Sequence, residues 1–226
     1  MVGHLPGGGR DRFLEPAVSG RDANPLRAII RRFDNFLSDR EGLFCFNADP
    51  ENILRLQVRK APHGMDLNGE RIRTGQPVLA IHLWSAHLPP LAPPGADGAS
   101  PGATGGAYVV WAVQTQRRFV RSLRMVAETM QRDPDLAPLR AIYAATSLFT
   151  PVTGASGVHP MARLGFTVIP YASPLGAFGN FWENAYALAL MWAYNPASAH
   201  SRQLLKIQRT EMWAATRDFL ARYGAR

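Results

Sequence analysis

Residues 78–95 read VLAIHLWSAHLPPLAPPG, and this stretch decides the fold class because it passes from a strand pattern into a loop composition. Successive side chains of a strand point to opposite faces, so His82 and Trp84 are expected to lie side by side on one face. The opposite face is entirely aliphatic and is the expected core face. The prolines that follow cannot continue a strand, so we expect the chain to leave the sheet there.

A second strand is predicted in the segment that precedes it, ILRLQVRKA at residues 53–61. Its aliphatic residues alternate with polar ones, which predicts a half-buried strand whose basic outer face carries Arg55, Gln57 and Arg59. Between the two strands, Asn68-Gly69 is the pair that a type I′ turn prefers, because both central residues need a positive φ. A hairpin is therefore predicted there.

Several helices are predicted around these strands. The first begins with Asn24 as its N-cap and Pro25 at the first helical position, and it ends at Gly42. A long central helix is expected at about 108–131, and a C-terminal helix from about Ser198 to Tyr223, with Trp213 on its basic stripe.

Three further segments complete the pattern. RAIYAATSLF at 140–149 fits either a buried strand or a short helix, whereas HPMARLGFTVIPY at 159–171 predicts a helical turn followed by a strand. The apolar run at 175–194 has the length of a bilayer span, but Glu183 lies in its middle. A buried core helix is therefore the preferred interpretation of that run.

The domain organisation follows from length and composition. The chain has 226 residues, of which 46% are hydrophobic, enough for the core of one domain. We predict a disordered arm at 1–23 and a single domain at 24–226, with a flexible insertion rich in proline, glycine and alanine at 89–107. The expected fold is mixed α/β (α+β), a small mixed sheet on which an N-terminal, a long central and a long C-terminal helix pack.

Charge and cysteine content restrict the partners. Lys and Arg number 25 against 17 acidic residues, a formal charge of +8, which favours an anionic partner such as a sugar phosphate or a lipid phosphate. No nucleic-acid-binding motif is recognisable, so no specific nucleic-acid partner is predicted. The single Cys45 excludes an internal disulfide, and the start of the chain has no apolar signal segment. We therefore expect a cytoplasmic protein.

The candidate site residues lie on the two strands. If the strands are neighbours with aligned faces, Arg55 and Arg59 would hold an anion, Trp84 would stack on a sugar or an acyl group, and His82 would be the catalytic hydrogen-bond donor or proton carrier. The histidines do not have the spacing of a metal site, so neither a metal nor another cofactor is predicted. GASGVH at 154–159 lacks the second glycine of a nucleophile elbow.

Several stretches together resemble the YkoP-like domain, a bacterial family: LRAIIRRFDNFLSDREGLFCFNADPENILRLQV, LNGERIRTGQPVLAIHLWS, LRAIYAATSLF with HPMARLGFTV, and LLKIQRTEMWAATRDFLARYG. The resemblance implies a role in cell-envelope carbohydrate or glycolipid metabolism, in the setting of polysaccharide deacetylases, without an established reaction. It also implies an acidic residue two places before His82, where this chain has Ala80.

A second, shorter stretch, MARLGFTVIP at 161–170, is similar to a late helix-to-strand segment of acetyl-coenzyme A dependent N-acetyltransferases. That resemblance implies coenzyme A as the cofactor and a V-shaped opening between neighbouring parallel strands. The Gln/Arg-x-x-Gly-x-Gly/Ala loop that holds the pyrophosphate in those enzymes is not found in this sequence. A third hypothesis is peripheral binding to an anionic membrane, such as the inner membrane, through the basic faces of the last two long helices.

Overall fold

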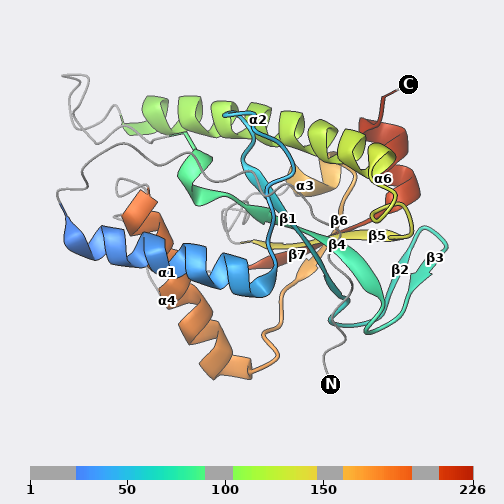
Figure 1. Ribbon diagram of the computed structural model, residues 1–226, viewed down its shortest axis with the longest axis horizontal. Coiled ribbons are helices and arrows are strands. Elements are labelled where there is room, and N and C mark those ends of the chain that lie inside the picture. Colours follow the sequence, from blue (N-terminus) through green and yellow to red (C-terminus); the bar gives the residue numbers. More distant parts are fainter. Residues whose placement is uncertain (1–23, 90–103, 147–159, 195–208, 226) are drawn as a thin grey trace.

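The computed structural model describes residues 24–89, 104–146, 160–194 and 209–225 (Figure 1). The predicted arm at 1–23, most of the predicted insertion and the GASGVH segment lie outside these residues. The chain forms, in order, α1 (Pro25–Glu41), β1 (Leu54–Lys60), β2 (Met65–Leu67), β3 (Glu70–Ile72), β4 (Pro77–Leu83), the short 3₁₀-helix η1 (Ser85–His87), α2 (Thr104–Arg132), β5 (Ala141–Thr146), α3 (Pro160–Arg163), β6 (Thr167–Pro170), α4 (Gly176–Tyr194), β7 (Thr210–Ala215) and α6 (Thr216–Tyr223).

A five-stranded mixed sheet forms the centre of the molecule, with the strand order β1-β4-β5-β7-β6. Strands β4 and β5 are parallel, and the other neighbouring pairs are antiparallel. A parallel pair needs a crossover connection, and α2 lies between these two strands in the sequence. The mixed α/β fold class is therefore confirmed.

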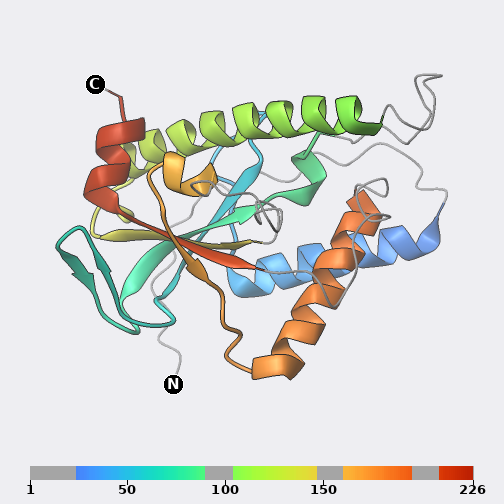
Figure 2. The same cartoon turned by 180° about the vertical axis from the view of Figure 1, so that it is seen from behind.

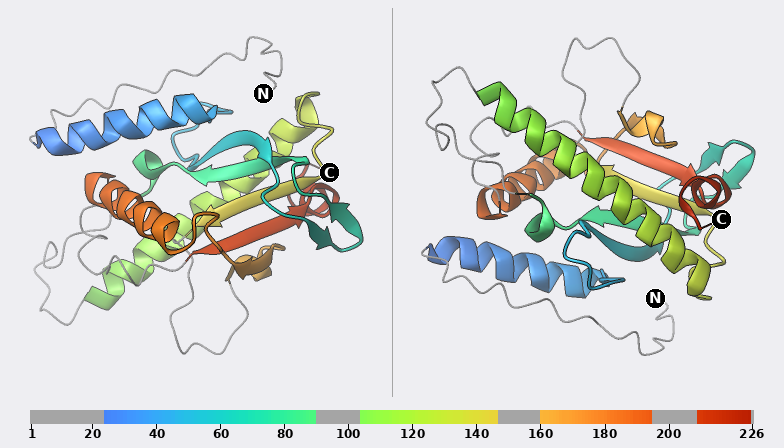
Figure 3. Two further views of the ribbon diagram at one scale, coloured as in Figure 1. Left: turned by 90° about the horizontal axis from the view of Figure 1, so that it is seen from below. Right: turned by 90° about the horizontal axis from the view of Figure 1, so that it is seen from above.

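Helices α2 and α6 cover one face of the sheet, and α1, α4 and the β2-β3 hairpin lie on the other (Figures 1 and 2). The covered face holds the larger core, in which α2 contributes Phe119, Leu123 and Val126 and α6 contributes Phe219. On the other face, the hairpin buries Leu67 and Ile72 against Trp213 and Tyr143 at one end of the strands. Helices α1 and α4 lie beside each other at the opposite end of that face (Figure 3).

The local signals read from the sequence are confirmed. The Asn24 side chain accepts a hydrogen bond from the backbone N–H of Leu26 at 3.0 Å, and α1 ends where Gly42 adopts a left-handed conformation with φ of 72°. In the hairpin, Asn68 and Gly69 both have positive φ values, 53° and 85°. The ambiguous segment after residue 140 forms β5, a strand.

The predicted long C-terminal helix is wrong. Residues 210–215 form β7, a strand paired on both sides, and only Thr216–Tyr223 are helical there. Trp213 is therefore fully buried in the sheet instead of lying on a basic stripe. The cause is burial on both faces of β7, which removes the alternation of apolar and polar residues that marks a strand. Helix α2 also begins at Thr104, inside the predicted insertion.

The prediction that residues 175–194 form a buried core helix is wrong as well. Helix α4 lies at the surface, and Phe178 and Trp182 are 67% and 57% exposed. Its main packing partners are α1 and η1, so the sheet does not enclose it. In the part of the chain that the structure describes, no helix has both the length and the apolar content that crossing a bilayer requires.

Candidate functional site

The sheet opens between β4 and β5 at their carboxyl ends. The two strands are in register at only two residue pairs, Leu79 with Ile142 and Ala80 with Tyr143. Beyond those pairs each strand stays paired with its outer neighbour, β4 with β1 as far as Leu83 and β5 with β7 as far as Thr146. The two strands therefore diverge from each other, and their facing edges form a V-shaped opening.

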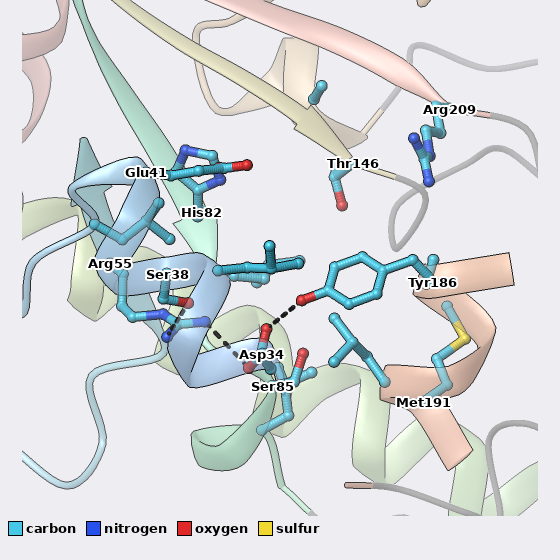
Figure 4. Close-up of a pocket in the computed structure, with 17 residues that line it drawn as sticks. Asp34, Ser38, Glu41, Arg55, His82, Ser85, Thr146, Tyr186, Met191 and Arg209 are labelled. Atoms are coloured by element: carbon cyan, nitrogen blue, oxygen red, sulfur yellow. Dashed lines mark hydrogen bonds and ion pairs between the residues drawn. The ribbon is translucent and has the colours of Figure 1, made fainter. Parts of the chain in front are cut away.

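A pocket of about 340 Å³ lies at this opening, between α1, α4 and the strand ends (Figure 4). Its position follows a general rule for sheets with parallel strands, in which ligands bind outside the carboxyl ends. The polar residues that line the pocket come from six parts of the chain: Asp34, Ser38 and Glu41 of α1, Arg55 of β1, His82 of β4 with Ser85 after it, Thr146 of β5, Tyr186 of α4, and Arg209 just before β7.

A small second cavity continues the opening toward the α2 side of the sheet. It shares Leu83, Ala145 and Thr146 with the larger pocket and is otherwise lined by core side chains, among them Phe119 of α2 and Met212 of β7. The opening therefore leads from the α1/α4 side into the layer between the sheet and α2. With a volume of about 10 Å³, this second cavity has room for about one water molecule.

One wall of the pocket is built around the buried carboxylate of Asp34. It accepts hydrogen bonds from the hydroxyl groups of Tyr186 at 2.7 Å and Tyr194 at 3.2 Å, and it lies 3.6 Å from the guanidinium group of Arg55. Arg55 also donates to the Ser38 hydroxyl at 2.9 Å. Burial and the hydrogen bond to Asp34 raise the pKa of Tyr186 well above its ordinary value, so this hydroxyl stays protonated.

The tautomer of His82 is set by a chain of hydrogen bonds. The Gln57 side-chain amide N–H donates to the backbone carbonyl of Glu41 at 2.7 Å, so its oxygen faces His82 Nε2 at 3.0 Å. An amide oxygen can only accept, which places the imidazole proton on Nε2 and leaves Nδ1 as the acceptor. Burial, with the positive charges of Arg59 and Arg55, lowers the pKa of His82 to about 4. The ring is therefore a neutral base at pH 7.

The opposite wall carries a second ion pair, between Arg209 and Glu183. The Glu183 carboxylate also accepts hydrogen bonds from the Tyr171 and Ser173 hydroxyl groups, at 3.1 and 2.9 Å. Arg209 is mostly buried, and its guanidinium group lies 5.8 Å from the centre of the Tyr171 ring. The charged residues that line the pocket are thus two carboxylates, Asp34 and Glu41, and two arginines, Arg55 and Arg209.

The structure brings some of the predicted site residues together. Arg55 is the direct cross-strand partner of His82, so the basic face of β1 and the histidine face of β4 coincide. Arg55 is only 6% exposed, however, so the expectation of an outer basic face is wrong at this position. Arg59 pairs with Val78 farther along the strand, lies over the Tyr143 ring and does not line the pocket.

Trp84 also lies outside the pocket lining. It comes directly after β4 and is 4% exposed, so it does not share an open strand face with His82. Its ring stacks on His87, with centroids 3.6 Å apart, and the Arg55 guanidinium group lies 5.9 Å from its centre. Trp84 is therefore a buried neighbour of Arg55, which does line the pocket.

Sequence reasoning missed Asp34, Tyr186 and Arg209. A signal for Asp34 existed, because Asp34 and Ser38 are four residues apart and share one side of a helix whose other side is apolar. Tyr186 could not be found in this way, since 152 residues separate it from its partner Asp34. Arg209 was assigned to a helix that the structure replaces with β7.

Comparison with known proteins gives no family. No family model, no curated protein and no solved structure matches this chain. Among the residues that the structure describes, no group of three or more histidine, cysteine, aspartate or glutamate side chains is arranged to hold a metal ion. What the site can do must therefore be argued from its own geometry.

Proposed function

We propose that the protein is an acyltransferase that uses an acyl-coenzyme A, and that the pocket between α1 and α4 binds the acceptor. The observation that carries this function is the divergence of β4 and β5 after two residue pairs. A V-shaped opening between neighbouring parallel strands is what the resemblance of residues 161–170 implies, and the pocket between α1 and α4 lies at this opening. Coenzyme A is the cofactor that this function requires.

The chemistry of the two strand edges supports this choice. Where β4 and β5 separate, the backbone N–H and C=O groups on their facing edges no longer pair with each other. An extended ligand with its own amides can pair with such an edge, as a peptide does when it adds to a sheet. The pantetheine arm of coenzyme A is an extended chain with two amides, so it suits this position.

His82 can move the proton that acyl transfer releases. An amine or hydroxyl acceptor attacks the thioester carbonyl, so a C–N or C–O bond forms and the C–S bond breaks, while the acceptor proton passes to Nδ1 of His82. A pKa of about 4 makes the neutral ring a weak base and its imidazolium a far stronger acid than a thiol, so the charged ring would be short-lived and would pass the proton to the departing coenzyme A sulfur. The products are the acylated acceptor and free coenzyme A.

Binding of coenzyme A is the direct test. In a thermal-unfolding assay, coenzyme A at about a hundred times its dissociation constant should stabilise the wild-type protein by about 2.7 kcal/mol, roughly 5–10 °C in Tm. Ala145→Trp would fill the opening, because Ala145 lines both cavities, and should abolish the shift. Ala221→Trp, an exposed alanine on α6, is the matched control and should keep it. Equal shifts in both variants would contradict this position for the ligand.

A second candidate is binding of an anionic small molecule, such as a sugar or lipid phosphate, in the envelope role that the YkoP-like resemblance implies. It is favoured by Arg55 and Arg209, which line the same pocket, since guanidinium groups bind phosphate well. The same assay separates the two functions. A shift with sugar phosphates that Arg209→Met abolishes, with no shift by coenzyme A, would favour the binding protein.

A further inference from the structure

Helix α1 has its polar and apolar sides reversed relative to an ordinary surface helix. Its buried residues are Asp34 and Ser38, which face the pocket. Its exposed side carries an apolar stripe at helical spacing, in which every member is more than half exposed: Leu26, Ile29, Phe33 and Phe36. A surface helix of a globular protein normally turns such a stripe toward the core, so this one is free to contact something outside the molecule.

The start of α4 carries a second exposed apolar cluster. Phe178, Phe181 and Trp182 are exposed and contact one another, with ring centroids 5.3–6.2 Å apart, and Leu175 before them is 70% exposed. Both helices lie on the side of the sheet away from α2 and α6 (Figure 2), and a contact between the Phe33 and Tyr186 rings joins them at 6.3 Å. Large exposed apolar patches mark interaction sites.

Positive charge accompanies the stripe. Residues 25–33 contain Arg27, Arg31 and Arg32 and no carboxylate. Arg27 and Arg31 face α4: they lie over the aromatic rings of Trp192 and Tyr194, at 5.0 and 5.1 Å, and Arg31 donates to the backbone carbonyl of Ala193 at 2.9 Å. Of the three, Arg32 is the one whose side chain is exposed. Aromatic and aliphatic side chains next to arginines are typical of helices that lie in the interface of an anionic bilayer.

We propose that the exposed apolar side of α1 and the start of α4, defined by the eight residues above and called the α1/α4 surface, binds to the surface of an anionic membrane. A second copy of this chain on the same surface is the alternative occupant that the experiment separates from a membrane. Since the inner sides of the same helices wall the pocket, a ligand in the pocket would lie next to the bilayer. This inference holds whatever reaction the pocket performs.

Vesicle co-flotation of the full chain tests the proposal. The protein should float with vesicles that contain phosphatidylglycerol, should float much less with phosphatidylcholine alone, and should be released as salt is raised from 0.1 to 0.5 M, because salt screens the arginines. The double variant Ile29→Ser/Phe178→Ser should lose at least about tenfold in affinity for these vesicles. Its matched control is Val109→Ser/Val110→Ser, which removes two valines of similar exposure from α2 and should leave binding unchanged.

The outcomes are separable. Circular dichroism checks that each variant is folded. The thermal shift with coenzyme A tests ligand binding separately, without a membrane. Equal flotation of both double variants, or no flotation with any vesicle, would overturn the proposal. A dimer in sedimentation velocity that Ile29→Ser/Phe178→Ser separates into monomers would overturn it in favour of a second copy on the α1/α4 surface.

Discussion

Two histidines that contact the same side of the sheet have pKa values shifted in opposite directions. The His82 ring is neutral at pH 7, because burial and the positive charges of the arginines beside it lower its pKa to about 4. His63 has both ring nitrogens next to acceptors, the Gly64 carbonyl at 3.0 Å and the buried Glu211 carboxylate at 2.7 Å, and these hydrogen bonds raise its pKa. Charge at these positions therefore depends on local partners and not on residue type.

The lowered pKa of His82 predicts a loss of stability in acid. Between pH 6.5 and about 4 the unfolded chain binds a proton at this residue and the folded protein does not, so the free energy of unfolding falls as pH falls. From pH 7.5 to 5 the loss is about 2 kcal/mol. We expect His82→Gln to lose less Tm than the wild type over this interval in calorimetry. An equal loss in both proteins would contradict a neutral, buried His82.

The raised pKa of His63 predicts the opposite dependence. Its stabilisation is fully present below pH 6.5, the unfolded value, and is lost as pH rises through the higher pKa of the folded protein. Wild-type protein should therefore lose more Tm between pH 6 and pH 9 than His63→Gln. A measurement in which the two proteins fall in parallel would mean that the contact with Glu211 does not hold a charged imidazole.

At the residue level, sequence reasoning succeeded where a signal is local. The cap at Asn24 and the turn at Asn68-Gly69 depend on the backbone within a few residues, and both are confirmed. The predicted site required Arg55 and His82 to lie on aligned faces of neighbouring strands, and the strand register makes them direct cross-strand partners. The partners of Asp34 depend on tertiary packing between α1 and α4, which no local pattern encodes.

At the level of elements, the errors share one physical cause. Strand β7 is paired on both edges and buried on both faces, so its sequence has no polar alternation, and its alanines and methionine suit a helix equally well. Helix α4 is apolar around most of its circumference, which in a globular protein normally indicates burial, yet it lies at the surface. In both cases the apolar composition of the segment does not determine whether it lies inside the sheet or at the surface.

The N-cap of α1 gives a prediction at this scale. Asn24→Ala removes the hydrogen bond to the Leu26 backbone and should lower the free energy of unfolding by about 1 kcal/mol, or 2–4 °C in Tm. Because α1 forms a wall of the pocket, ligand affinity should fall as well. Asn180→Ala, at an exposed position inside α4, is the matched control and should be neutral or slightly stabilising. A neutral Asn24→Ala would contradict the observed cap.

At the level of the whole molecule, the last strand in the sequence is interior in the sheet. Strand β7 pairs with β5 on one side and β6 on the other, and it contributes the fully buried Trp213. The sheet therefore cannot be completed until the C-terminal residues are available. Such long-range pairing makes the fold depend on strands that are far apart in the sequence.

Truncation tests this dependence. A chain that ends at residue 208 should lose its cooperative thermal transition, because β5 and β6 then lack their shared partner and Tyr143 loses its contact with Trp213. A chain that lacks only residues 225 and 226 should unfold like the full-length protein. A cooperative transition in the chain that ends at 208 would show that β7 is dispensable for the fold.

The two residue pairs between β4 and β5 also have a mechanical consequence. On either side of them the sheet is held by ladders of seven pairs, between β1 and β4, and of six pairs, between β5 and β7. Under a pulling force β4 and β5 should therefore separate first, while the β1–β4 and β5–β7 pairs stay intact. A molecule bound to the edges of both β4 and β5 would connect the two pairs and raise the rupture force, so single-molecule pulling would detect its binding without any chemical reaction.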